Sequence, residues 1–337
     1  MGFRSDFRRA YRVFLGRYPP ITKSDVVWAY RVFLGRRPEN ERVVREHCRA
    51  SDLRALCENF IGSAEFKLKA GTVAGDRYRE PLPIFLPRLS VETSADADEL
   101  RQLWDRVRRA WESLGDERLF HSVLTDDRYL PSQFGDFAAE FWQSGEVEAW
   151  DLAGHLASLG LVNLEDAVVL EFGCGVGRVS IPLAAIARSV VAYDISERHL
   201  EFARKRATAL GRTNMQVLAI GSGLPVDFEP CDVFYSRIVL QHNPPPIIGE
   251  VIKRLIRSLR SGGVGVVQVP TYCVGYRFSI SEALRSPIKL DMDMHCYPQA
   301  SLFSLIADEG ARLIQVRDDD APGRRDLFVS NTFVITK

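Results

Sequence analysis

The sequence predicts an α/β protein with a Rossmann-like sheet, preceded by a small all-helical module. The first observation is the segment VVLEFGCGVGRVS, residues 168–180, where an apolar run leads into three glycines at alternate positions. Continuous hydrophobicity is typical of a strand buried on both faces of a parallel sheet. The second observation is that strand and helix patterns alternate through residues 166–337. The third is Asp194, which ends the next predicted strand.

The glycine segment predicts a strand, a tight turn and the start of a helix. Gly173, Gly175 and Gly177 allow the backbone to turn sharply and to approach a ligand, and the following helix offers free N–H groups. Glu171, just before the turn, would repel a pyrophosphate but suits a cationic ligand. The third glycine follows the second by two residues, not by the three of the dinucleotide fingerprint.

An acidic residue followed by G-x-G-x-G resembles the first motif of the class I S-adenosylmethionine-dependent methyltransferases. The resemblance covers about residues 120–337. It implies a seven-stranded sheet whose last strand is antiparallel, with S-adenosyl-L-methionine as the cofactor. With the reasoning from the residues, it predicts cofactor contacts at Glu171, Gly173, Cys174, Gly175, Gly177, Asp194, Ile195, Ser222, Leu224 and Ser236.

Asp194 lies 17 residues after Gly177, where a carboxylate can accept hydrogen bonds from both hydroxyls of a ribose. This feature alone would also suit NAD. Ser222 stands where the family commonly has an acidic residue that accepts from the adenine amine, so this chain departs from the pattern there. Leu224 could pack on the adenine ring, and by resemblance the backbone around Ser236 receives the methionine part of the cofactor.

Two histidines lie where the resemblance places the acceptor, and a hydroxyl acceptor needs a base because its proton leaves as the new bond forms. We predict His295 and His242 as catalytic candidates, while His242 could instead cap the helix that follows it. The predicted substrate-binding residues are Gln241, Tyr297, Asp293 and Trp142. The other histidines, including His199, are interpreted as incidental.

The segment Asn243-Pro244-Pro245 invites comparison with the N-P-P-aromatic motif of adenine-N6 methyltransferases. That motif abuts the strand end and finishes in Tyr or Phe, whereas here it lies seven residues later and finishes in Pro246. A nucleic acid substrate is therefore not favoured.

The N-terminus contains an internal repeat, because AYRVFLG occurs at residues 10–16 and again at 29–35. Each copy is followed by proline and predicts an amphipathic helix; further helices are predicted at 39–47 and after Ser51 as N-cap. Residues 26–68 resemble a small bacterial helical domain of unknown function found beside glycan enzymes. We predict a helical module over 1–72, a linker over 73–98, a helical lid over 99–165 and the methyltransferase domain over 166–337.

Composition excludes several classes. No apolar run is long enough to span a membrane and no signal-peptide core is found, so we expect a cytoplasmic protein. The six cysteines and six histidines form no metal-ligand spacing, so no metal is expected. Residues 1–70 carry 15 Lys and Arg against 8 Asp and Glu, a net +7 that leaves −7 for the remainder of a neutral chain. The module could contact a protein or a membrane surface, or simply present a solvated face.

These observations favour methyl transfer to an acceptor hydroxyl on a sugar, a glycan precursor or a similar small molecule. N-methylation of a small metabolite remains an alternative within the class. Two alternatives come from other classes: a binding subunit that keeps the fold without catalysis, which Ser222 and the basic module would suit, and an NAD-dependent oxidoreductase, which Glu171 and the glycine spacing oppose.

Overall fold

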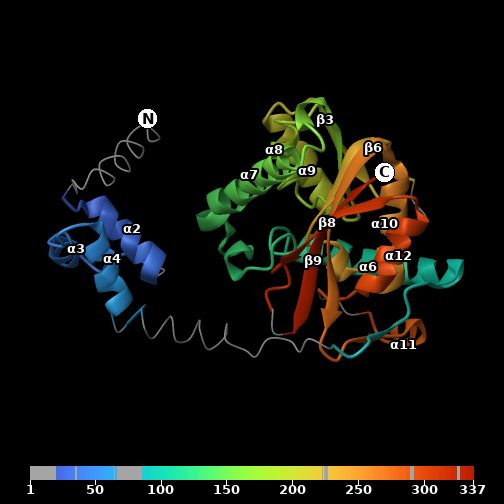
Figure 1. The fold of residues 1–337 in the computed structure, drawn as a ribbon, viewed down its shortest axis with the longest axis horizontal. Helices are drawn as coiled ribbons and strands as arrows, with labels where there is room; N and C mark the ends of the chain where they lie inside the picture. The colour runs from blue at the N-terminus through green and yellow to red at the C-terminus, as the bar shows by residue number, and fades with distance from the viewer. Residues whose placement is uncertain are drawn as a thin grey trace. The chain divides into compact units, whose positions relative to one another are not determined.

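The protein divides into two compact units, Met1–Pro83 and Ile84–Lys337. Figure 1 shows the computed structural model, which describes residues 20–34, 36–63, 65–66, 86–221, 223, 227–288, 292–324 and 327–337 of the chain. Each unit has a hydrophobic core of its own. Among the described residues, no helix has both the length and the apolar character needed to cross a membrane.

The N-terminal unit packs three short helices around aromatic side chains. They are α2 (Lys23–Leu34), α3 (Glu41–His47) and α4 (Leu53–Gly62). Tyr30 of α2 meets Phe60 of α4 edge to face, with ring centroids 4.9 Å apart. Residues 29–34 of the second repeat copy belong to α2, whereas residues 10–16, the first copy, lie outside the described residues.

One predicted helix start in this unit is wrong. Asp52, not Ser51, caps α4, because its carboxylate accepts a hydrogen bond from the backbone N of Ala55 at 2.8 Å. A carboxylate at this position satisfies one of the unpaired N–H groups of the first turn.

The C-terminal unit is built on a seven-stranded sheet. Its strands are β2 (Val168–Phe172), β3 (Ser189–Asp194), β4 (Met215–Ala219), β5 (Cys231–Ser236), β6 (Leu259–Cys273), β8 (Arg312–Asp319) and β9 (Phe328–Thr336). Their order is β4-β3-β2-β5-β6-β9-β8, with β9 antiparallel to both neighbours and the first five parallel. The predicted sheet with an antiparallel last strand is confirmed.

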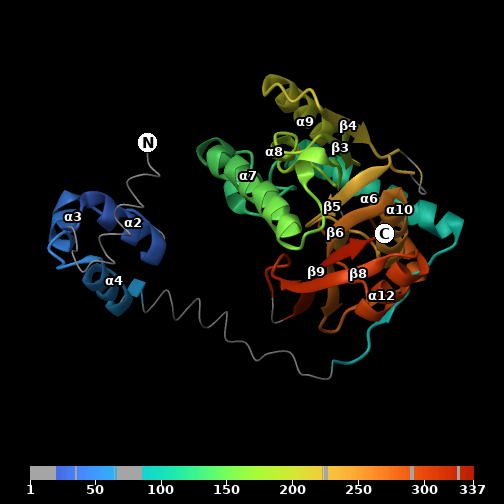
Figure 2. The same ribbon diagram turned by 45° about the horizontal axis from the view of Figure 1, so that its top comes forward.

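Helices cover both faces of this sheet. They are α6 (Ala97–Glu117), α7 (Phe134–Ser158), α8 (Ser180–Leu183), α9 (Glu197–Ala209), α10 (Pro245–Ser258), α11 (Ile280–Arg285) and α12 (Gln299–Asp308). Side chains of α6, α10 and α12 pack on one face, and those of α7 and α8 pack on the other. Figures 1 and 2 show α7 and α10 on opposite sides of the strands.

Alternate residues of β2 illustrate why the two layers form. Val169 is fully buried under α7 and α8, while Leu170 is fully buried under α10. Glu171 points to the same side as Val169 because successive side chains of a strand alternate. A carboxyl group is therefore carried into the apolar layer beside α7.

Two boundaries in the sheet region differ from what the sequence pattern predicts. The pattern of residues 179–187 predicts a helix, but α8 covers only Ser180–Leu183; beyond it the chain forms turns, in which the carbonyl of Pro182 accepts from Ala185 and that of Leu183 accepts from both Ile186 and Ala187. The apolar pattern after Gly263 predicts a strand that ends at Val269, but β6 continues to Cys273, since β9 pairs with it as far as Phe328.

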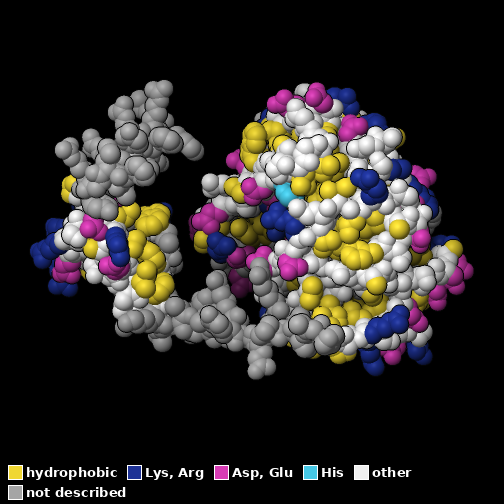
Figure 3. Space-filling model, in the orientation of Figure 1, with side chains coloured by type: hydrophobic (Ala, Val, Ile, Leu, Met, Phe, Trp, Pro, Cys, Tyr) yellow, Lys and Arg dark blue, Asp and Glu magenta, His cyan; other side chains and the backbone are white. Residues whose placement is uncertain are grey.

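The segment of residues 270–298, whose sequence predicts a long connection, contains structure of its own. A short strand, β7 (Arg277–Phe278), pairs in parallel with β1 (Ser90–Val91), and α11 follows it. Figure 3 shows positive and negative side chains interspersed over the face of this unit in view.

Helix α7 offers a first test of the packing. A Cβ atom on Gly145 would lie 2.0 Å from the carbonyl oxygen of Arg178, whereas one on Gly154 of the same helix would meet nothing within 4 Å. We expect Gly145→Ala to lower the free energy of unfolding by about 3 kcal/mol or more. Gly154→Ala should raise it by roughly 0.5–1 kcal/mol, because alanine favours the helix.

Urea unfolding of the two variants beside the wild type measures both changes. Equal effects at the two positions would contradict the close contact between α7 and the chain after the glycine turn.

Candidate active site

The glycine turn after β2 forms the centre of the site. Its backbone N–H groups at Gly173 and Cys174 both donate to the carbonyl of Tyr193, at 2.8 and 2.9 Å. Gly173 has φ +80°, and a Cβ there would lie 2.4 Å from the side chain of Val239. Only glycine allows this close approach, so the turn can lie directly beneath the loop that follows β5.

Asp194 fixes the far side of the turn. Its carboxylate accepts hydrogen bonds from the backbone N of Gly175 at 2.8 Å and of Ser196 at 2.9 Å. Each carboxylate oxygen has two lone pairs, so both can still accept from ligand hydroxyls. The arrangement suits the two hydroxyls of a ribose.

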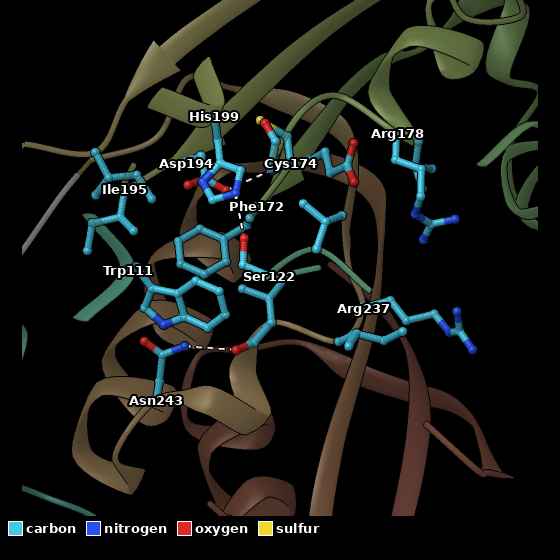
Figure 4. Close-up of a pocket in the computed structure, with 18 of the residues that line it drawn as sticks. Trp111, Ser122, Phe172, Cys174, Arg178, Asp194, Ile195, His199, Arg237 and Asn243 are labelled. Carbon is cyan, nitrogen blue, oxygen red and sulfur yellow. Dashed lines mark hydrogen bonds between the residues drawn. The ribbon is translucent and has the colours of Figure 1, made fainter. Parts of the chain in front are cut away.

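A cavity opens above these groups (Figure 4). Of the ten predicted cofactor residues, those that line it are Glu171, Gly173, Cys174, Gly175, Asp194 and Ile195. Gly177 packs against Ile181 and Ala203 behind the turn, and the Ser236 hydroxyl donates to the carbonyl of Phe172 at 3.0 Å, which joins the ends of β2 and β5. Ser222 and Leu224 lie outside the described residues.

Glu171 is buried in the cavity wall, and the hydroxyl of Ser180 donates to it. Burial raises the pKa of Glu171 to about 8, with Ser180 opposing the shift. The group is therefore mostly protonated at neutral pH, because the charged form has lost its hydration. A cationic ligand beside it would favour the carboxylate again.

His199, interpreted from sequence as incidental, lies in the cavity wall. It is 2 % exposed, and its Nε2 lies 3.0 Å from the carbonyl of Leu119 and 2.9 Å from the hydroxyl of Ser122. A carbonyl only accepts, so Nε2 carries the proton, and burial lowers the pKa of the ring. His199 thus ties α9 to the segment after α6.

That contact also requires Gly115 at the end of α6, since a Cβ there would lie 2.3 Å from the hydroxyl of Ser196. Sequence reasoning missed His199 because its partners come from a segment some 80 residues earlier. The sequence feature that could have indicated it is Ser196, the N-cap of α9. A helix that begins there places its third residue, His199, beside the cavity.

A second cavity adjoins the first. Val107 and Trp111 of α6 line both. The second cavity brings together three predicted residues, His242, Asp293 and His295. We name it the acceptor cavity, for the role proposed below.

The remaining predicted substrate residues lie elsewhere. Gln241 is 3 % exposed and bonded within the protein. Tyr297 is 4 % exposed and packs towards Gly249 on α10. Trp142 stands in an aromatic cluster on α7, where the guanidinium of Arg206 lies 3.6 Å from the centre of its ring.

The two candidate bases have different surroundings. Both ring nitrogens of His242 are engaged, Nδ1 with the carbonyl of Asp293 at 3.1 Å and Nε2 with the amide nitrogen of Gln241 at 3.2 Å. Burial lowers the pKa of His242 to about 4, so the ring is neutral and a weak base. His295 places its Nδ1 2.8 Å from the hydroxyl of Tyr276 in the wall of the acceptor cavity.

A buried amide network joins the two cavities. Ile238 has φ +61°, a strained conformation for a β-branched residue, and its N–H donates to the side chain of Gln268 at 2.9 Å. The amide nitrogen of Gln268 donates to Ser330 at 2.8 Å and to Gln241 at 3.2 Å. The backbone carbonyl of Gln241 accepts from the backbone N of His295 at 2.7 Å.

Comparison with known proteins agrees with this geometry. Residues 169–263 match a family described as a methyltransferase domain. The chain is 29% identical over 168 residues to a 23S rRNA (uracil-C(5))-methyltransferase of Marinomonas sp., covering 45% of this chain and 36% of that protein. It is 32% identical over 107 residues to a ubiquinone biosynthesis O-methyltransferase of Caulobacter vibrioides, covering 30% of this chain and 39% of that protein.

Among solved structures, magnesium protoporphyrin IX methyltransferase from Synechocystis, with bound S-adenosylhomocysteine, superposes with a TM-score of 0.50. It is 19% identical and covers 68% of this chain and 98% of that chain, which shows a shared fold. The chain spans less than half the length of the two curated relatives described above.

The fold, the glycine turn and the acidic residue at the end of β3 define a class I methyltransferase domain. Residues 169–263 of this chain match such a domain, and the resemblance implies S-adenosyl-L-methionine as the cofactor. The residues present fit that group: Asp194 can accept from a ribose, and the buried carboxyl of Glu171 suits a cation. The hypothesis of an NAD-dependent oxidoreductase is not supported.

The raised pKa of Glu171 has a consequence for stability. The carboxyl ionises near its usual value of 4.5 in the unfolded chain but near 8 in the folded protein. Stability therefore falls as pH rises from about 5 to 8, by up to about 1.4 kcal/mol per pH unit, because the unfolded state releases its proton first. We expect this part of the pH dependence of stability to be absent in the variant Glu171→Gln.

Urea unfolding of the unliganded protein and of this variant at pH 5.5, 6.5 and 7.5 measures the difference. Parallel pH profiles for the two proteins would show that Glu171 is not held protonated.

Gln268 provides a second prediction. Gln268→Leu leaves the N–H of Ile238 and the partners at Ser330 and Gln241 without their hydrogen bonds, so we expect a loss of about 2 kcal/mol or more in stability. Affinity for S-adenosylhomocysteine should also fall, because residues 237–239 line the cofactor cavity.

The matched control is Gln216→Leu, which changes an exposed glutamine of β4 and should alter stability by less than about 0.5 kcal/mol. Unfolding curves and calorimetric titration of both variants provide the measurement. Similar losses in the two variants would argue against the network.

Proposed function

We propose that the protein transfers a methyl group from S-adenosyl-L-methionine to a hydroxyl of a small acceptor, of the class of sugars or glycan precursors, held in the acceptor cavity. The observation that carries the proposal is the position of this cavity. It shares Val107 and Trp111 with the cofactor cavity, so the two cavities adjoin at these side chains and ligands in them would lie next to each other. Methyl transfer requires such alignment of donor and acceptor above all.

The lining of the acceptor cavity supports a hydroxylated ligand. Trp111 and Phe278 offer aromatic surface on which the apolar face of a sugar ring can pack. Ser279, Glu282 and Asp293 offer oxygen atoms for hydrogen bonds with hydroxyl groups. The mixture of aromatic and oxygen-bearing groups suits a polar ring better than a flat apolar one.

His295 is the base in this proposal. S-adenosylmethionine, when bound, supplies a methyl group on a positively charged sulfur. The acceptor hydroxyl then loses its proton as its oxygen forms the new bond, and His295 accepts that proton at its imidazole. The Tyr276 hydroxyl beside Nδ1 orients the ring, while His242, whose two nitrogens are engaged, holds the loop around Asp293 in place.

A screen of acceptors tests the function. The protein is incubated with S-adenosylmethionine and with sugars, sugar nucleotides, phenols or amines, and formation of S-adenosylhomocysteine is followed. Turnover with hydroxylated saccharides is the expected result. Turnover confined to amines would replace this proposal by N-methylation, and binding of the cofactor without turnover on any class would favour a non-catalytic role.

The variant Ala283→Phe tests where the acceptor binds, since Ala283 of α11 lines the acceptor cavity but not the cofactor cavity. Filling the acceptor cavity should abolish turnover and leave affinity for S-adenosylhomocysteine unchanged. Unchanged turnover would place the acceptor elsewhere.

The base is tested by His295→Ala, which should lower kcat about 10²- to 10⁴-fold at constant cofactor affinity. Tyr276→Phe should cost less, because it removes only the orienting hydrogen bond. His155→Ala is the control, since His155 bonds to Gln315 of β8 and lines neither cavity. Full turnover in the His295 variant would remove the proposed base but not the methyltransferase activity.

A further inference from the structure

Helix α6 carries an arginine, Arg106, into the wall of the acceptor cavity. The residue is half-buried, and its Nη2 donates to the backbone carbonyls of Ser286 at 2.6 Å and of Pro287 at 3.1 Å. Within the described parts of the chain, the guanidinium makes no other hydrogen bond and no ion pair with a carboxylate. Its Nε and Nη1 therefore remain available to a ligand.

The charge of Arg106 distinguishes it from other arginines of the same helix. Arg101 pairs with Asp98 at 2.8 Å, and Arg108, which is also half-buried, pairs with Glu112 at 2.8 Å. Taking a charge out of water costs free energy unless an opposite charge offsets it. An anionic group in the cavity would supply the charge that no carboxylate of the described chain supplies to Arg106.

None of the other charged side chains of the cavity, as far as the structure describes it, pairs with Arg106. Arg277 of β7 lies 3.9 Å from Glu282 of α11, and their side chains are 77% and 57% exposed, so this pair is loose. Asp293 lies beside His242, whose Nδ1 bonds to its backbone carbonyl at 3.1 Å. The acidic groups of the cavity thus belong to other contacts.

Arg106 and the histidines lie at different positions along α6. The ring of Trp111 meets that of His242 edge to face, with centroids 5.4 Å apart. Arg106 precedes Trp111 by five residues, which corresponds to about 7.5 Å along the helix axis. A ligand that fills the cavity would therefore reach from the histidines at one end to a cation at the other.

We propose that the acceptor carries an anionic group, a phosphate or a carboxylate, and that Arg106 binds this group while the acceptor hydroxyl faces His295. The proposal rests on the proposed function and narrows its substrate class from sugars in general to anionic sugars. Nε and Nη1 of Arg106 offer charge-assisted hydrogen bonds to the anionic oxygens. Arg277, in the same cavity wall, can add a second contact.

The test compares acceptors that differ only in the anionic group. Glucose and galactose are each compared with their 6-phosphate and their uronate, which add a phosphate or a carboxylate at one end of the same ring. Calorimetric titration of the protein saturated with S-adenosylhomocysteine measures each affinity, and turnover assays measure each KM.

We expect the wild type to bind at least one anionic sugar about 10- to 100-fold more tightly than its neutral parent. Arg106→Gln should remove most of this preference and change the affinity of the neutral sugar less than about threefold. The phosphate and uronate measurements show which anion the site prefers. The preference should also fall as ionic strength rises, because salt screens the charges.

Two further variants serve as controls. Arg106→Lys keeps the positive charge with fewer and differently placed donors, and should retain part of the preference. Arg109→Gln removes an exposed arginine of the same helix that lines neither cavity, and should change none of the affinities. Unchanged affinity for S-adenosylhomocysteine shows that each variant is folded.

Three outcomes would overturn the proposal. Equal losses for charged and neutral sugars in Arg106→Gln would mean that Arg106 only holds the end of α11, through Ser286 and Pro287. Equal affinities of the wild type for charged and neutral sugars would remove the anionic acceptor and leave methyl transfer to a neutral one intact. Binding of none of these sugars would remove the saccharide acceptor of the proposed function, and this proposal with it.

Discussion

The site depends on the close contact between the glycine turn after β2 and the segments that surround it. Added Cβ atoms at Gly173 and Gly175 would lie 2.4 Å from Val239 and 2.8 Å from Val123. Gly173 and Gly175 can therefore carry no side chain, and the backbone at these two positions forms the floor of the cofactor cavity. Hydrogen bonds to Tyr193 and Asp194 hold this floor against β3, so the positions of the ribose acceptor and of the turn are fixed together.

Acidic and basic side chains lie at opposite ends of the cofactor cavity. Asp194 at one end keeps both carboxylate oxygens bonded to backbone N–H groups, whereas Arg178 and Arg237 at the other end share a single carboxylate. Glu171 lies in the same wall and stays protonated because burial penalises its charge. A ligand with hydroxyls at one end and a zwitterionic tail at the other is therefore distinguished from a dinucleotide by charge as well as by shape.

Sequence predicted the parts of the site that a single local segment determines. The glycine spacing and the acidic residue at the end of β3 each follow from one strand and its turn, and in the structure the backbone N of Gly175 lies 2.8 Å from the carboxylate of Asp194. Arg237 and His199 were missed because their roles arise from contacts with α7 and with the segment after α6. The proximity of His242 to the acceptor cavity was predicted, but its burial and its bond to Gln241 depend on tertiary packing that no local pattern contains.

Helix α6 couples the two cavities. Trp104, Val107 and Trp111 recur at the three- and four-residue spacing of one helical face, and the last two line both cavities. The helix is tied to the unit along its length: the indole of Trp104 donates to the carbonyl of Gly221 at 3.2 Å, and Gly115 approaches Ser196 too closely for any side chain. Because the side chains shared by the two cavities belong to a fixed helix and not to a loop, the spacing of the cavities is set by the fold itself. Under the proposed function, changes in acceptor preference should therefore arise from the residues of the acceptor cavity outside this shared face, since a change in the shared face would disturb the cofactor cavity as well.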